Sequence, residues 1–138
     1  MKLLQQMCKI HAPSGEEFAM TKFLLNYINK KQKDWKTQPT LHYGQGFQDN
    51  IIMVFGTPTT AIFSHLDSIG FTVKYNNKIV KIGGPVTTEG IELVGEDSKG
   101  KIEGKIIKKE ENLFIDFARE IDRGTSLTFK VNFRDTKN

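Results

Sequence analysis

The side chains best suited to chemistry in this sequence are His65 and Asp67, which stand two residues apart. On an extended backbone, residues i and i+2 point to the same face, so the imidazole and the carboxylate can reach one another. Metal-binding histidines commonly donate their second ring N–H to a carboxylate, which fixes the tautomer and the ring orientation. The spacing is therefore compatible with a metal ligand held by a carboxylate, and the alternative is a solvated histidine at the end of a strand.

The other candidate residues have simpler interpretations. His11 and His42 lie among polar residues, and we expect both to be solvated rather than bound to a metal ion. Glu16 and Glu17 form an acidic pair, but they come at the start of an expected helix, where the helix dipole favours carboxylates. Because a catalytic zinc ion takes about three protein ligands, His65 alone does not make a metal centre.

A broken helix is expected before this pair. Apolar residues recur at helical spacing through residues 2–30, with an interruption at Pro13, which disfavours helical backbone at the residue before it. Ser14 and Glu17 form a capping-box pattern, in which each side chain accepts a backbone N–H of the first helical turn.

Two short apolar runs follow the helix, at residues 50–55 and 60–65. Their near-continuous apolarity indicates strands that are covered on both faces, as in a sheet flanked by helices. The second run ends at His65, and open α/β sheets place their sites at the carboxyl ends of strands.

Beyond Asp67 the hydrophobic pattern alternates and the chain becomes rich in strands. Turn residues separate six expected short strands, near residues 70–75, 78–82, 91–94, 101–107, 113–117 and 125–131. Six closely spaced strands predict a small β-barrel or sandwich. No Pro/Ser/Gly-rich linker separates the two halves, which is typical of the entry to an inserted domain.

The composition excludes several classes of protein. The chain has 138 residues, of which 38% are hydrophobic and 26% charged, enough apolar material for a folded core. No apolar run reaches the ~20 residues of a membrane helix. The single cysteine, Cys8, fits the reducing cytoplasm, and the lysines behind the net charge of +4 are too dispersed to predict nucleic-acid binding.

The residues around His65 resemble the first metal motif of the M42 family of metallo-aminopeptidases, which includes glutamyl and deblocking aminopeptidases. In that motif an apolar strand ends in His-x-Asp and leads into Ile-Gly-Phe and a further strand, as in residues 60–73 here. The similarity extends backwards to Ala12-Pro13-Ser14-Gly15-Glu16-Glu17 and forwards, in order, through the glycine-containing segments 82–84, 93–95, 100–104 and 122–125. It covers essentially the whole chain, but only the N-terminal part of the family pattern.

The resemblance implies a two-metal hydrolase that releases N-terminal residues from peptides with the help of two divalent ions, zinc or cobalt. His65 would be a metal ligand, and Asp67 would be the catalytic-site carboxylate beneath it. The remaining ligands and the general base come later in the family pattern. We therefore expect this chain to be an inactive portion of such an enzyme.

The implied fold class is α/β plus β. Residues 1–68 would form the incomplete N-terminal segment of a catalytic, helix-flanked peptidase sheet of phosphorylase/hydrolase-like type. Residues 69–133 would form an inserted small β-barrel that shapes the substrate site and makes homo-oligomer contacts through exposed edges such as Ile79–Ile82, and residues 134–138 would begin the return. The alternative is a non-catalytic β-rich interaction module with a peptidase-like opening.

Overall fold

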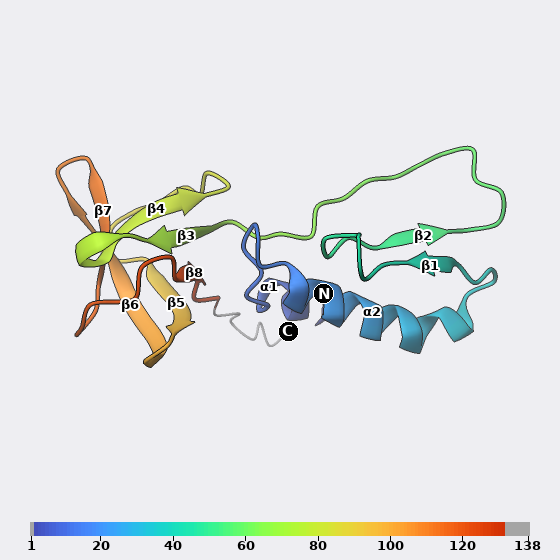
Figure 1. Cartoon of the computed structure of the whole chain (residues 1–138), viewed down its shortest axis with the longest axis horizontal. Helices are drawn as coiled ribbons and strands as arrows, with labels where there is room; N and C mark the ends of the chain where they lie inside the picture. Colours follow the sequence, from blue (N-terminus) through green and yellow to red (C-terminus); the bar gives the residue numbers. More distant parts are fainter. Residues whose placement is uncertain (1, 132–138) are drawn as a thin grey trace, which may run out of the picture.

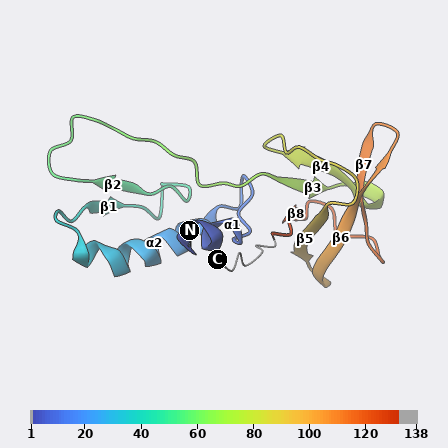
Figure 2. The same ribbon diagram turned by 180° about the vertical axis from the view of Figure 1, so that it is seen from behind.

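Helices and a small sheet occupy one end of the molecule, and a β-barrel occupies the other (Figure 1). The structure is a computed structural model that describes residues 2–131, so the expected return at residues 134–138 lies outside the described residues. Seen from behind, the first helix lies between the two parts (Figure 2). No helix within residues 2–131 is long and apolar enough to cross a membrane.

Two α-helices interrupted at Pro13 begin the chain, as the apolar spacing predicts. Helix α1 spans Lys2–Cys8 and helix α2 spans Phe18–Lys31, followed by a short 3-10 turn, η1, at Gln32–Asp34. Lysines occupy the last turn of α2, where positive charge complements the helix dipole.

The capping box predicted at the start of α2 is wrong for Ser14. Glu17 stands at the N-cap position, no side chain caps the helix, and the Glu17 carboxylate accepts the Gly15 N–H at 2.8 Å. The Ser14 hydroxyl donates to the Asp67 carboxylate instead. The reason is geometric: a capping hydroxyl reaches only the second or third helical N–H, and α2 begins too late, at Phe18.

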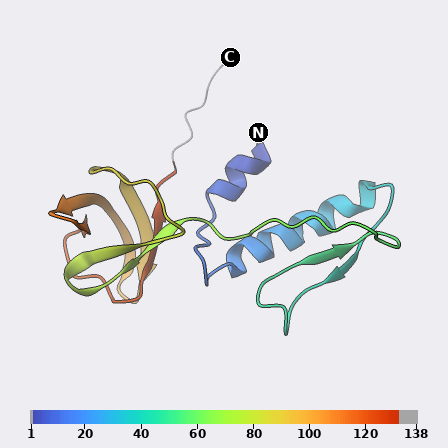
Figure 3. The same ribbon diagram turned by 90° about the horizontal axis from the view of Figure 1, so that it is seen from above.

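A two-stranded antiparallel sheet lies beside α2 (Figure 3). It consists of β1 (Thr40–His42) and β2 (Ile52–Val54). The Thr21 hydroxyl on α2 donates to the Asp49 carbonyl oxygen just before β2. Beyond the helix, Trp35 packs against Phe55 with ring centroids 6.1 Å apart. These contacts hold the helix against the sheet.

The strand predicted at residues 60–65 is wrong. This segment forms neither helix nor strand, its Ile62 and Phe63 are 94% and 91% exposed, and it belongs to a long arc that runs outside β2 (Figures 1 and 2). An apolar run becomes a strand only where a neighbouring strand takes up its backbone hydrogen bonds. In the described part of the chain β2 pairs with β1 alone. Residues 60–65 therefore have no neighbouring strand there.

The six strands predicted in the second half are confirmed, and they close into an antiparallel barrel in the order β3-β4-β7-β6-β5-β8. Their bounds are Gly70–Val73 (β3), Lys78–Ile82 (β4), Glu92–Asp97 (β5), Gly100–Lys109 (β6), Asn112–Asp116 (β7) and Ser126–Phe129 (β8). A short 3-10 turn, η2 (Tyr75–Asn77), joins β3 to β4. Closure depends on β8, which pairs with both β3 and β5.

The barrel holds the main apolar core. Its fully enclosed side chains are Phe71, Val73, Ile79, Leu93, Ile102, Ile106, Ile115, Ile121 and Leu127. Along β6 the buried Ile102 and Ile106 alternate with solvent-facing lysine and glutamate side chains, because successive strand residues point to opposite faces. The barrel wall is tight where Gly104 on β6 faces Ile115 on β7.

Barrel closure covers part of the edge that was expected to be exposed at Ile79–Ile82. Strand β4 lies between β3 and β7 and is hydrogen-bonded to both. On the β3 side the ladder covers residues 79–82, whereas on the β7 side the register among the described residues covers Lys78 and Ile79 alone. Contacts between copies through this strand, like oligomerisation itself, therefore stay a prediction.

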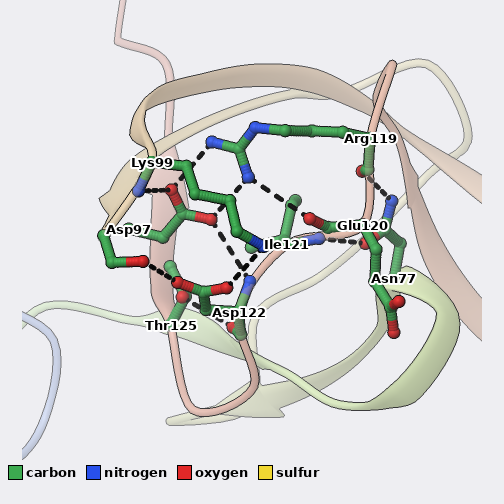
Figure 4. A network of polar contacts seen from close by, with 9 residues as sticks. Asn77, Asp97, Lys99, Arg119, Glu120, Ile121, Asp122 and Thr125 are labelled. Atoms are coloured by element: carbon green, nitrogen blue, oxygen red, sulfur yellow. Dashed lines mark hydrogen bonds and ion pairs between the residues drawn. The ribbon is translucent and has the colours of Figure 1, made fainter.

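A network of ion pairs and hydrogen bonds ties the β5–β6 turn to the loop before β8 (Figure 4). Arg119 donates hydrogen bonds of 2.6 and 2.7 Å to Asp97, whose carboxylate is fully enclosed. The Asp122 N–H adds a third bond to Asp97 at 3.2 Å, and the Asp122 carboxylate lies 2.9 Å from the Lys99 ammonium group. Hydrogen bonding from Arg119 holds the pKa of Asp97 well below its ordinary value. The network thereby fastens the loop that carries the core residue Ile121.

Candidate functional site

His65 and Asp67 approach one another as their spacing predicts. The Nδ1 atom of His65 lies 3.2 Å from Asp67 Oδ1 and 3.0 Å from the Asp67 carbonyl oxygen. A carbonyl oxygen and an oxygen of an ionised carboxylate are both acceptors and cannot donate a hydrogen bond. Nδ1 must therefore carry the proton, which leaves the lone pair of the neutral imidazole on Nε2.

This tautomer suits metal binding. The His65 side chain is 85% exposed, so a ligand can reach the ring. Together with Asp67 it lines an open cavity of about 520 Å³, to which Gly15, Glu17 and residues 48–50 also contribute. A histidine whose Nδ1–H is held by a carboxylate presents Nε2 to a metal ion. The geometry is that of one oriented ligand.

Ser14 is the residue of this site that the sequence analysis missed. Its hydroxyl donates to Asp67 Oδ2, on the other carboxylate oxygen from His65. That hydrogen bond is the main reason why the pKa of Asp67 lies below its ordinary value, with burial acting in the opposite direction. The two residues are 53 positions apart, and the pattern around Ser14 indicated a helix cap instead.

Backbone contacts bring these distant residues together. The Ser68 N–H donates to the Ala12 carbonyl oxygen at 2.7 Å, and Pro13 forms an isolated parallel bridge with Ser68. Ala12 and Pro13 are both buried. Gly70 fits against them: a side chain there would come within 3.2 Å of the Pro13 Cβ atom. The chain entering the barrel is thus laid directly beside residues 12–14.

His11 and Glu16 join this segment to the barrel. His11 Nδ1 lies 3.0 Å from the Thr128 hydroxyl on β8, and its Nε2 lies 3.5 Å from the Glu16 carboxylate. Glu16 in turn accepts a 2.7 Å hydrogen bond from the Ser126 hydroxyl. The solvated state predicted for His11 is therefore wrong, because the fold places β8 against it. His42 is exposed on β1, as predicted.

The described residues do not complete a metal centre. No group of three or more histidine, cysteine, aspartate or glutamate side chains capable of holding a metal ion is present among residues 2–131. His65 therefore fits a metal ion as a single ligand, and a two-metal site would need donors beyond this set.

Comparison with known proteins found no protein-family model that matches this chain. A search of curated proteins also found no match.

Proposed function

We propose that this chain is part of a two-metal aminopeptidase of the M42 type, in which His65 supplies one metal ligand and Asp67 orients it. The observation that carries the proposal is the position of His65 Nδ1, 3.2 Å from Asp67 Oδ1 and 3.0 Å from the Asp67 carbonyl oxygen, on a side chain that is 85% exposed. Bound divalent ions would supply Lewis-acid chemistry for hydrolysis of the first peptide bond. The residues of this chain would hold and orient one ion, with peptides as substrates and the cytoplasm as location.

The apolar surface of the first part supports a larger catalytic layer. Most of the exposed large apolar side chains among the described residues precede the barrel: Leu4, Phe18, Tyr43, Ile52, Phe55, Ile62, Phe63 and Ile69. In the proposal, other parts of the catalytic layer cover these side chains. In the proposal, further strands of the peptidase sheet pair with the segment around Ile62, and the barrel is an insertion into that sheet.

The alternative is a non-catalytic interaction module, and it has an observation of its own. The barrel closes on itself around a complete core, and residues 2–131 hold no metal-binding group of three side chains. A module of this kind would use the same exposed apolar surface to bind a partner protein and would need no metal ion.

The test is made on the polypeptide as it occurs in its source, captured with an antibody against the barrel. We expect a mass well above the 15.7 kDa of this chain and zinc- or cobalt-dependent release of the first residue from an unblocked peptide. The same peptide with an acetylated N-terminus should be resistant. His65→Ala in the natural polypeptide should abolish activity, and the matched control His42→Ala should retain it. A native mass equal to this chain without metal-dependent activity would establish the interaction module instead.

A further inference from the structure

Three side chains from two distant segments form a continuous hydrogen-bonded row, Ser14–Asp67–His65. The Ser14 hydroxyl donates to one oxygen of the Asp67 carboxylate, and the other oxygen lies 3.2 Å from His65 Nδ1. The histidine stands at one end of the row and the serine at the other. In a nucleophilic triad the histidine stands in the middle, so Ser14 is not arranged as an activated nucleophile.

We propose that Ser14 is a positioning residue, whose hydroxyl holds the Asp67 carboxylate against His65 and thereby keeps the imidazole in the Nδ1-protonated form. The metal-binding consequence of this form rests on the function proposed above. The control of the tautomer by Ser14 does not, because it concerns only contacts within this chain.

The exposure of the row explains why such a support is needed. The His65 side chain is almost fully exposed, so neighbouring side chains do little to restrict it, and its orientation depends on the Asp67 carboxylate, which is about one-third exposed. A carboxylate in this setting can rotate about its Cβ–Cγ bond or turn to water. A hydrogen bond from Ser14 to one oxygen fixes the direction of the other, and a charged acceptor makes that bond stronger than a neutral one.

The position of Ser14 does not depend on its hydroxyl. Its neighbours Ala12 and Pro13 are buried, and the 2.7 Å bond between the Ser68 N–H and the Ala12 carbonyl oxygen fixes the local backbone. The hydroxyl caps no helix, since α2 has no side-chain cap. Removing it should therefore change the state of the carboxylate and leave the fold intact.

The experiment measures the tautomer of His65 directly in the full 138-residue chain. Long-range ¹H–¹⁵N spectra at about pH 8.5, where histidine is neutral, distinguish protonated Nδ1 from protonated Nε2. We expect mainly Nδ1–H in the natural chain. In Ser14→Ala the ratio of Nδ1–H to Nε2–H should fall about fivefold, the effect of losing one hydrogen bond of ordinary strength.

Two further variants separate positioning from a general structural effect. Ser14→Thr keeps the hydroxyl and should restore the natural ratio. Ser64→Ala removes a hydroxyl beside His65 that donates a 3.4 Å hydrogen bond to the His65 carbonyl oxygen, and it should leave the ratio unchanged. Thermal unfolding of each variant reports whether the fold is intact.

The outcomes are separable from those of the proposed function. An unchanged ratio in Ser14→Ala, or equal falls in Ser14→Ala and Ser64→Ala, would overturn the role of Ser14 even if the native polypeptide proved to be a metal-dependent aminopeptidase. A ratio that falls in Ser14→Ala and recovers in Ser14→Thr would establish the role even if the native polypeptide had no peptidase activity.

Discussion

Neighbouring isoleucines on β6 should differ sharply in what they contribute to stability. Ile106 is fully buried in the barrel core, opposite the buried Ile115 on β7. Ile107 follows it in sequence, pairs with Phe114 and is only partly buried, because the next strand residue points to the other face. The pair Ile106→Ala and Ile107→Ala therefore removes the same atoms from the inside and the outside of the barrel wall.

The magnitude follows from the atoms removed. Isoleucine to alanine deletes three carbon atoms, which at about 0.8 kcal/mol each is about 2.4 kcal/mol of lost transfer free energy. The cavity left at position 106 adds to this, so the expected loss of unfolding free energy is about 3–4 kcal/mol for Ile106→Ala. Ile107→Ala should cost about 1 kcal/mol, since its site is partly solvated and can adapt.

Urea and thermal unfolding followed by circular dichroism measure the difference. At roughly 4 °C per kcal/mol, Ile106→Ala should lower Tm by about 12–16 °C and Ile107→Ala by about 4 °C. Unchanged m-values would show that both variants unfold the same amount of surface. Equal losses from the two variants, or a larger loss at position 107, would refute the register of β6, because a slip of one residue exchanges the two faces of a strand.

Three further outcomes are expected. Gly104→Ala should lower the free energy of unfolding by about 1–3 kcal/mol. The new Cβ atom would overlap the Asp116 carbonyl oxygen and come within 2.8 Å of the Ile115 side chain. Equal melting temperatures for the variant and the natural chain would contradict the tight barrel wall. Arg119 lowers the pKa of Asp97 in the folded state. The stability that the ionised Asp97 carboxylate contributes is therefore complete above its unfolded-state pKa of about 4, and it is lost as the pH falls through the lower pKa of the folded state. Urea unfolding between about pH 6 and 2 should consequently show a shallower acid decline in Asp97→Asn than in the natural chain, and parallel declines would argue against the Arg119 contact. Because residues 2–131 hold no metal-binding group of three side chains, a chelator should leave the Tm of the isolated chain unchanged, and a chelator-dependent Tm would reveal a structural metal ion.

The strands of the barrel could be predicted from sequence because their signals are local. Alternation of apolar residues along β6 and turn residues between the strands mark each strand without reference to any other. Closure could not be predicted in the same way. It depends on β8 pairing with β3, more than 50 residues earlier in the chain, and with β5 at the same time, and no local pattern reports such a pairing. For the same reason the sequence did not reveal that the segment Ile79–Ile82 pairs with β3 along its whole length.

The strand predicted at residues 60–65 shows that a local signal can also fail when no partner strand is present. Its composition favours a strand, but the strand state requires a partner for the backbone, and no described strand lies beside Ile62 and Phe63. Composition reports that a segment can be buried. It does not report whether anything is present to bury it.

For the candidate site, the sequence by itself determined the pairing of His65 with Asp67, because two residues on one extended segment meet through local geometry alone. Tertiary structure alone decided what supports that pair. Ser14 reaches Asp67 across 53 positions, and His11 reaches β8 across 117. Both contacts exist because residues 12–14 lie against the strand that enters the barrel. Contacts between distant segments depend on how whole elements pack, which short-range spacing does not encode.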